Sequence, residues 1–337
     1  MSYPETTSAI DPLTRLAIRH GTDKWGPHFY TPIYNALFAH LRERSLRLLE
    51  IGVGGYAFRT AGGASLSMWA EYFPHGEITG IDIVEKRLHL DPRIKLFQGS
   101  QEDAVFLKKI SDERGPFNII IDDGSHLPKH MVASFKILFP LLADDGIYII
   151  EDVQTAFWPH LGGSALHGGE VLKLVRSIVE YLHHAEIAVV DRSHVPPLIA
   201  TQVKALRVFH NLIVIDKGDN GEPSNHAYNP NNPNNPHAAR AIAIIEEELE
   251  KEPTPEGTAN LIEIYCRSGN PTKATALADE ALAKWPDNPM VAMAAFNIAP
   301  LTKTPMRIDY IERFLRLEPD NVTLLQALVK ARGSVKT

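Results

Sequence analysis

Two pairs of acidic residues in this chain stand where they could bind a metal ion. Asp122 and Asp123 follow one run of isoleucines, and Glu151 and Asp152 follow a second. Short β-branched runs that end in carboxylates are typical of buried parallel strands, and ligands of open α/β sheets bind beyond the carboxyl ends of such strands. We therefore expect Asp123, Glu151 and Asp152 to converge on one hard divalent cation, Mg²⁺ or Mn²⁺. The competing interpretation is ordinary turn and capping chemistry.

A histidine beside the first acidic pair is the candidate general base. His126 lies three residues after Asp123, ahead of a helix expected to begin near Pro128. Imidazole titrates nearest neutral pH, which suits a general base. His130 is the weaker candidate for this role, because it lies one turn into that helix. The alternative is a histidine that only supports the metal ligands or the loop. Farther along, the aromatic loop around Trp158 could stack on a sugar ring or an aromatic acceptor, or anchor a lid.

A glycine-rich turn follows the first expected strand and indicates a cofactor site. Glu50 is followed by Gly52, Gly54, Gly55 and Tyr56. Glycines there permit positive φ and let the backbone approach a ligand closely. A dinucleotide fingerprint would run from a third glycine directly into a helix, whereas this turn is longer. An acid directly before the turn is the arrangement of class I methyltransferases that use S-adenosylmethionine (SAM).

Polar residues at the next turns favour SAM over a dinucleotide. Asp82 ends the second expected strand and suits the ribose hydroxyls. Ser65 begins the helix after the glycine turn, where it could cap that helix or reach the amino-acid end of SAM. Ser100 and Gln101 follow the third strand, where methyltransferases hold the adenine.

Strand and helix patterns alternate through the residues that must position this site. The predicted fold is α/β, a doubly wound Rossmann-like seven-stranded sheet with an antiparallel final pair and an all-α C-terminal extension. Strands are expected at 46–51, 77–83, 93–98, 117–122, 146–151, 186–191 and 206–215. Helices are expected at 64–73, 129–142 and 168–184. The expected domains are an N-terminal helical segment or lid at 1–45, the SAM-binding domain at 46–218, a linker at 219–236 and the helical extension at 237–337.

The C-terminal extension carries a weak repeat. Pro253, Pro286 and Pro319 recur every 33 residues. A period of about 34 residues with helix pairs is typical of tetratricopeptide-type repeats. A plain helical tail is the alternative, and the pattern leaves open whether these helices bind a second copy or another protein.

Composition excludes several classes of protein. The net charge of −7 without basic blocks argues against nucleic-acid binding. No apolar run approaches the ~20 residues of a membrane span, and no signal peptide is evident. Cys266 is the single cysteine, which fits a reducing compartment, so we expect a cytoplasmic protein.

With these residues in view, the chain resembles the metal-dependent sugar O-methyltransferases of macrolide and related antibiotic pathways, the mycinamicin type. The resemblance covers roughly residues 13–216 and is carried by segments 21–26, 50–56, 122–126, 151–152, 158–159 and 162–163. It implies an O-methyltransferase that acts on a sugar hydroxyl of a small-molecule glycoside. It also implies that Asp123, Glu151 and Asp152 hold Mg²⁺ and that His126 is the base. The implied SAM-binding residues are Glu50, Gly52, Gly54, Gly55, Tyr56, Ser65, Asp82, Ser100 and Gln101.

Three other functions stay open at this point. A catechol-type O-methyltransferase would use the same strand-tip carboxylates and Mg²⁺. An NAD-dependent oxidoreductase or sugar epimerase is disfavoured by the missing third glycine and by the lack of a Tyr-x-x-x-Lys pattern. A non-catalytic interaction protein would use the helical tail, but the intact acids and glycine turn argue against it.

Overall fold

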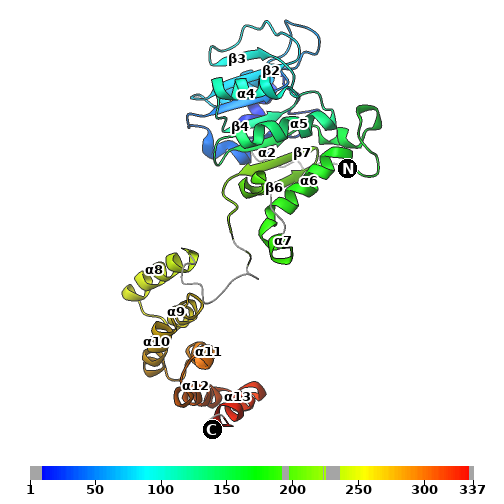
Figure 1. Cartoon of the computed structure of the whole chain (residues 1–337). Helices are drawn as coiled ribbons and strands as arrows, with labels where there is room; N and C mark the ends of the chain where they lie inside the picture. Colours follow the sequence, from blue (N-terminus) through cyan, green and yellow to red (C-terminus); the bar gives the residue numbers. More distant parts are fainter. Residues whose placement is uncertain (1–9, 192–196, 223, 225–235, 334–337) are drawn as a thin grey trace, which may run out of the picture. The chain divides into compact units, whose positions relative to one another are not determined.

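The computed structural model of the chain describes residues 10–191, 197–222, 224 and 236–333. The chain divides into two compact units, residues 1–223 and residues 224–337 (Figure 1). Most of the expected linker at 219–236 lies outside the described residues, so the expected domain boundaries stay predictions.

The described part of the first unit contains one seven-stranded sheet with the strand order β3-β2-β1-β4-β5-β7-β6. Strands β1 to β5 are parallel, and β7 runs antiparallel to both β5 and β6. The strand bounds are β1 (Arg47–Ile51), β2 (Glu77–Asp82), β3 (Ile94–Gln98), β4 (Ile119–Asp122), β5 (Ile147–Ile150), β6 (Val203–Phe209) and β7 (Leu212–Lys217). The predicted doubly wound seven-stranded sheet is confirmed, and its last two strands in sequence are antiparallel.

Two of the predicted strands differ from the structure. Residues 186–191 were expected to be a strand, but residues 186–190 belong to the helix α7 (His184–Val190). A short apolar run does not distinguish strand from helix by periodicity, and Ala188 in this run favours a helix. The expected strand at 206–215 is instead the hairpin of β6 and β7, because the chain turns at Asn211, whose φ of 63° suits a tight turn.

Helices cover both faces of the sheet. Successive residues of a strand point to opposite faces, so Leu48 packs in one hydrophobic core and Leu49 in the other. Helices α1, α2 and α3 contribute to the first core, and α4, α5 and α6 contribute to the second. Their bounds are α1 (Pro12–His20), α2 (Thr31–Phe38), α3 (Ala64–Tyr72), α4 (Ala104–Arg114), α5 (Pro128–Leu138) and α6 (Gly169–Leu182). The N-terminal helices are thus part of a core, and their role as a lid stays a prediction.

The second unit is helical throughout its described part. Its helices are α8 (Pro236–Lys251), α9 (Pro255–Arg267), α10 (Pro271–Lys284), α11 (Pro289–Ile298), α12 (Thr304–Leu317) and α13 (Val322–Gly333). Each helix packs on the next in sequence, and α9 also packs on α11 around a core rich in alanine. This packing agrees with stacked helix pairs, and the tetratricopeptide likeness stays a prediction.

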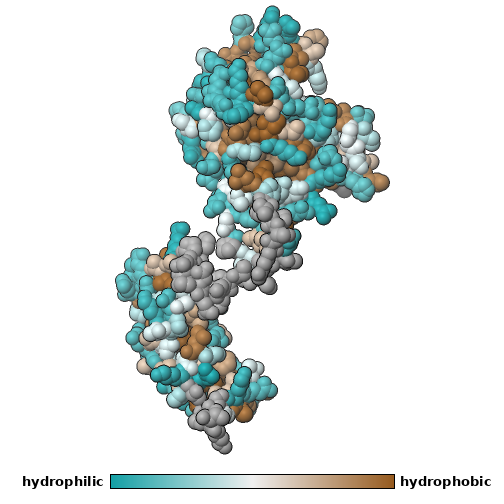
Figure 2. All heavy atoms as spheres, viewed as in Figure 1, coloured by the Kyte–Doolittle hydropathy of each residue, from teal (hydrophilic) through white to brown (hydrophobic). Residues whose placement is uncertain are grey.

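Hydrophilic residues cover much of the outer surface of each unit in the view of Figure 2, with hydrophobic residues showing between them. Among the described residues, none of the helices combines the length and the apolar character that a membrane span requires.

Candidate metal and cofactor site

The acidic residues predicted for metal binding lie where β4 and β5 end. These strands are parallel neighbours, and the amide of Glu151 donates to the carbonyl of Asp122, which places the two strand tips side by side. The side chain of Asp122 is directed into the second core, where it accepts hydrogen bonds from Ser134 and Gln101. Asp122 therefore braces the strand tip, and Asp123 is the residue left to face the site.

Three side chains at these tips form a candidate metal cluster. Ligand atoms of Asp123, His126 and Asp152 all lie within 4.8 Å of one another. The ring nitrogen Nδ1 of His126 is 3.6 Å from Oδ2 of Asp152, and it is buried without a hydrogen-bond partner among the described residues. Both residues have left-handed backbones, with φ of 55° and 54°. Non-glycine residues held in that conformation concentrate at functional sites.

Glu151, the third predicted metal ligand, is held by other groups. Its carboxylate is buried and lies 2.7 Å from the ammonium Nζ of Lys24. The hydroxyl of Tyr34 donates a hydrogen bond of 2.5 Å to the same carboxylate. Burial raises the pKa of Glu151 well above its ordinary range, the charge of Asp123 adds to that rise, and Lys24 opposes it.

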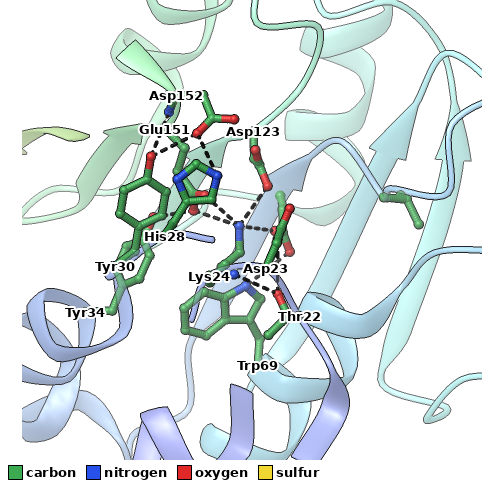
Figure 3. Close-up of polar contacts among 12 residues, drawn as sticks. Thr22, Asp23, Lys24, His28, Tyr30, Tyr34, Trp69, Asp123, Glu151 and Asp152 are labelled. Carbon is green, nitrogen blue, oxygen red and sulfur yellow. Dashed lines mark hydrogen bonds and ion pairs between the residues drawn. The ribbon is translucent and has the colours of Figure 1, made fainter. Parts of the chain in front are cut away.

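Lys24 is the residue that sequence reasoning missed. Its ammonium is fully buried and lies 2.8 Å from Asp123, 2.7 Å from Glu151 and 3.1 Å from Glu50 (Figure 3). Burial alone would lower the pKa of Lys24, but the three carboxylates outweigh that effect and hold its pKa well above the ordinary value. The side chain is therefore an ammonium ion inside a cluster of acids.

A short N-terminal segment delivers Lys24 to the site. Helix α1 ends at Gly21, whose φ of 67° turns the chain. The loop that follows is closed by a hydrogen bond from the amide of Tyr30 to the carbonyl of Lys24 and by a β-bridge between Trp25 and Phe29. The density of glycine, charge and aromatic residues in this segment was the available signal. Its partners lie 99 and 127 residues away, so local patterns do not reveal them.

The same segment also supports Asp152. The hydroxyl of Tyr30 donates a hydrogen bond of 2.9 Å to Oδ1 of Asp152, and Nε2 of His28 lies 3.5 Å from that oxygen. The rings of His28 and Tyr30 are stacked with centroids 4.7 Å apart (Figure 3). The orientation of Asp152 is thus set by residues that precede the sheet.

Beside the acids, two adjoining cavities of about 550 Å³ and 430 Å³ share Gly52, Asp82 and Gly124 in their walls. Volumes of this size are typical of small-molecule sites. Of the residues predicted to bind the cofactor, the first cavity is lined by Gly52, Gly54, Gly55, Tyr56, Ser65 and Asp82. The second is lined by Ser100 and Gln101. Asp123 and His126 also line the first cavity, so the cofactor and metal candidates meet there.

Glu50 does not line either cavity. It is fully buried behind the glycine turn, where it accepts a hydrogen bond of 3.1 Å from Nε1 of Trp69 and pairs with Lys24. Burial raises the pKa of Glu50, and Lys24 opposes that rise. Its place links the cofactor turn to the acids at the tips of β4 and β5.

The glycine turn and the tip of β4 are in direct contact. A Cβ atom at Gly52 would lie 2.0 Å from the carbonyl oxygen of Asp123, and Gly52 has φ of 94°. Only glycine allows this approach. The close contact keeps the metal candidate Asp123 against the wall of the cofactor cavity.

The fold and site define a class of protein. A seven-stranded mixed sheet with flanking helices, cavities beyond its strand tips and a helical C-terminal region is a Rossmann-like methyltransferase fold.

The known proteins most similar to the chain include named O-methyltransferases, although no family model matches it. It is 43% identical over 220 residues to the 8-demethyl-8-(2-methoxy-alpha-L-rhamnosyl)-tetracenomycin-C 3'-O-methyltransferase of Streptomyces olivaceus, a match covering 64% of this chain and 56% of that protein. It is 42% identical over 215 residues to the mycinamicin VI 2''-O-methyltransferase of Micromonospora griseorubida, which covers 62% of this chain and 53% of that protein. The chain thus spans about half the length of the curated relatives it matches.

Solved structures agree with this similarity. The MycE methyltransferase of the mycinamycin biosynthetic pathway, in complex with Mg and SAH, has a TM-score of 0.60 and 42% identity, with 64% of this chain and 56% of that chain covered. A further structure of the same enzyme holds Mg, SAH and mycinamycin VI. The resemblance expected from the sequence, to sugar O-methyltransferases of macrolide and related pathways, is confirmed.

Proposed function

We propose that this chain is a SAM- and Mg²⁺-dependent O-methyltransferase that acts on a sugar hydroxyl of a glycoside or glycosylated natural product. The observation that carries the proposal is the convergence of Asp123, His126 and Asp152 at two adjacent strand tips that open into the cofactor-sized cavity. The relatives, named as O-methyltransferases of a rhamnosyl-tetracenomycin and of mycinamicin VI, support the reaction and the class of acceptor.

The donor set fits a hard divalent cation. Asp123 and Asp152 offer carboxylate oxygens, which Mg²⁺ and Mn²⁺ prefer, and Glu151 stays the third proposed ligand. The ring of His126, whose Nδ1 has no hydrogen-bond partner among the described residues, lies beside the same two carboxylates. The glycine turn, Ser65, Asp82, Ser100 and Gln101 surround the proposed SAM site, and Glu50 supports that site from behind.

The residues of the chain have separate tasks in the proposed reaction. When bound, Mg²⁺ lowers the pKa of a coordinated sugar hydroxyl and SAM supplies the methyl group. His126 accepts the hydroxyl proton on a ring nitrogen. Tyr30 holds the carboxylate of Asp152 in place. Trp158, which is 44% exposed just beyond Asp152, is the proposed surface on which the sugar stacks.

Calorimetric titration with S-adenosylhomocysteine, with and without Mg²⁺ and then with NAD, tests the cofactor. We expect micromolar binding of S-adenosylhomocysteine and none of NAD. Absence of binding by folded protein would overturn the proposal. A screen for methyl transfer from labelled SAM to glycosides and catechols then tests the acceptor. Transfer to catechols alone would mean that the acceptor is a catechol and not a sugar.

The base is tested by substitution. His126→Ala should abolish methyl transfer while S-adenosylhomocysteine still binds, because the imidazole is needed for the proton and not for the cofactor. His184→Ala is the matched control, since His184 lies outside the two cavities and instead hydrogen-bonds the carbonyl of Asn220. If His126→Ala retains turnover, the base is another residue.

A further inference from the structure

Four carboxylates and one ammonium form an unbalanced charge cluster at the strand tips. Glu50, Asp123 and Glu151 each lie within 3.1 Å of the ammonium of Lys24, and Asp152 belongs to the adjoining metal candidate cluster. In the part of the chain that the structure describes, no second lysine or arginine lies within 4.0 Å of these carboxylates.

Burial makes this imbalance costly. The side chains of Glu50 and Glu151 are 0% and 2% exposed, so water screens little of their mutual repulsion. Buried charges persist in proteins only when they are paired or bind a metal. Lys24 provides that pairing here, and it contacts two of the three carboxylates proposed to bind Mg²⁺.

We propose that Lys24 is a positioning residue that substitutes for the divalent cation: its ammonium holds Asp123 and Glu151 together before the metal binds and competes with the metal afterwards. This inference rests on the metal part of the proposed function. The ammonium has one charge and no open coordination position, so it keeps the acids together without itself activating a hydroxyl.

The proposal predicts opposite effects of Lys24 on stability and on metal affinity. Lys24→Met keeps a side chain of similar length and removes the charge. Without metal, the carboxylates then repel one another, so the variant should unfold at a lower temperature than the wild type. With the competing charge gone, its affinity for Mg²⁺ should rise by at least about tenfold.

The experiment uses the full chain and Mg²⁺ alone, with neither SAM nor acceptor. Thermal unfolding is recorded in chelator and in Mg²⁺, and calorimetry gives the Kd for Mg²⁺. Lys217→Met is the matched control, because Lys217 is also buried but donates to the carbonyls of Pro140 and Leu142. We expect Mg²⁺ to raise the Tm of Lys24→Met more than it raises that of the wild type or Lys217→Met.

An equal or smaller rise in Tm for Lys24→Met, or weaker Mg²⁺ binding, overturns the proposal and makes Lys24 an ordinary structural partner. If Lys24→Met does not fold, the double variant Lys24→Met/Glu151→Gln is compared with Glu151→Gln. The Tm difference between these two should then be larger in chelator than in Mg²⁺, and equal differences overturn the proposal.

The outcome is separable from that of the proposed function. If the wild type binds S-adenosylhomocysteine and Mg²⁺ but Lys24→Met behaves like the wild type, the methyltransferase proposal stands and the proposal for Lys24 is wrong. Wild-type protein that binds no Mg²⁺ at all contradicts the metal part of both.

Discussion

The contact between the glycine turn and the tip of β4 can be broken by one methyl group. Gly52→Ala would place a Cβ atom 2.0 Å from the carbonyl oxygen of Asp123, whereas real Cβ contacts below 3.0 Å essentially do not occur. The loop after β4 must therefore move by about 1 Å, and overpacking of this kind costs about 1–3 kcal/mol. The positive φ of Gly52 adds about 1–2 kcal/mol, because an L-residue is strained there.

Gly54→Ala separates the two costs. Gly54 has φ of 74°, but the nearest atom to its added Cβ, Cα of Gly62, is 3.9 Å away. The free energy of unfolding should thus fall by only about 1–2 kcal/mol in Gly54→Ala, through backbone strain, and by about 2–5 kcal/mol in total in Gly52→Ala. The difference between the two losses of stability measures the cost of the clash with the carbonyl of Asp123 alone.

Urea unfolding of both variants gives the free energies, and calorimetry with Mg²⁺ reports whether Asp123 has moved. We expect Gly52→Ala to bind Mg²⁺ more weakly than the wild type and Gly54→Ala to bind it equally well. Equal stability and equal Mg²⁺ affinity of the two variants would refute the claim that Gly52 holds the β4 tip in place.

Three further predictions concern Tyr34, Asp122 and Cys266. Tyr34→Phe removes the hydroxyl that donates to Glu151, so the free energy of unfolding in urea should fall by about 2 kcal/mol, against about 1 kcal/mol for Tyr72→Phe, whose hydroxyl faces a neutral amide. Burial raises the pKa of Asp122 to about 6, so its carboxyl loses a proton more readily in the unfolded chain. Between pH 4 and pH 7 in chelator, the free energy of unfolding of the wild type should therefore fall by about 2 kcal/mol relative to that of Asp122→Asn. Parallel pH profiles of the two free energies would contradict this. Burial also raises the pKa of the Cys266 thiol, so less of it is thiolate at pH 7.5. Iodoacetamide should therefore react more slowly with Cys266 than with the thiol of free glutathione.

The sheet was predictable where strands are short, apolar and bounded by polar residues. Strands β1 to β5 lie within two residues of their expected bounds, and the acids at the tips of β4 and β5 lie where open parallel sheets bind ligands. The prediction was wrong at 186–191, because a run of alanine and branched residues fits a helix as well as a strand. The turn at Asn211 was missed because it lacks the usual Asn-Gly pair.

The part of the candidate site on the sheet was predictable, but the part contributed by the N-terminal segment was not. Glycines and acids at strand ends have local signatures, so the sequence singled out residues that line the cavity and placed Asp123, His126 and Asp152 beside one another, and their roles stay predictions. Lys24 has no such signature, because its partners come from three different strand ends. What positions it is the way the N-terminal segment folds back onto the sheet, and that depends on the whole core.

Charge balance was the physical argument that could have located Lys24. Glu50, Asp123 and Glu151 were all placed on or beside buried strands by sequence alone, and a buried carboxylate that keeps its charge is paired with a cation or binds a metal. A buried lysine or arginine was one way to supply such a cation, and no residue of the glycine-bounded segment that holds Lys24 had been assigned to the site. One ammonium cannot neutralise these carboxylates and Asp152 together, and a divalent cation at the strand tips would offset most of the negative charge that is left over.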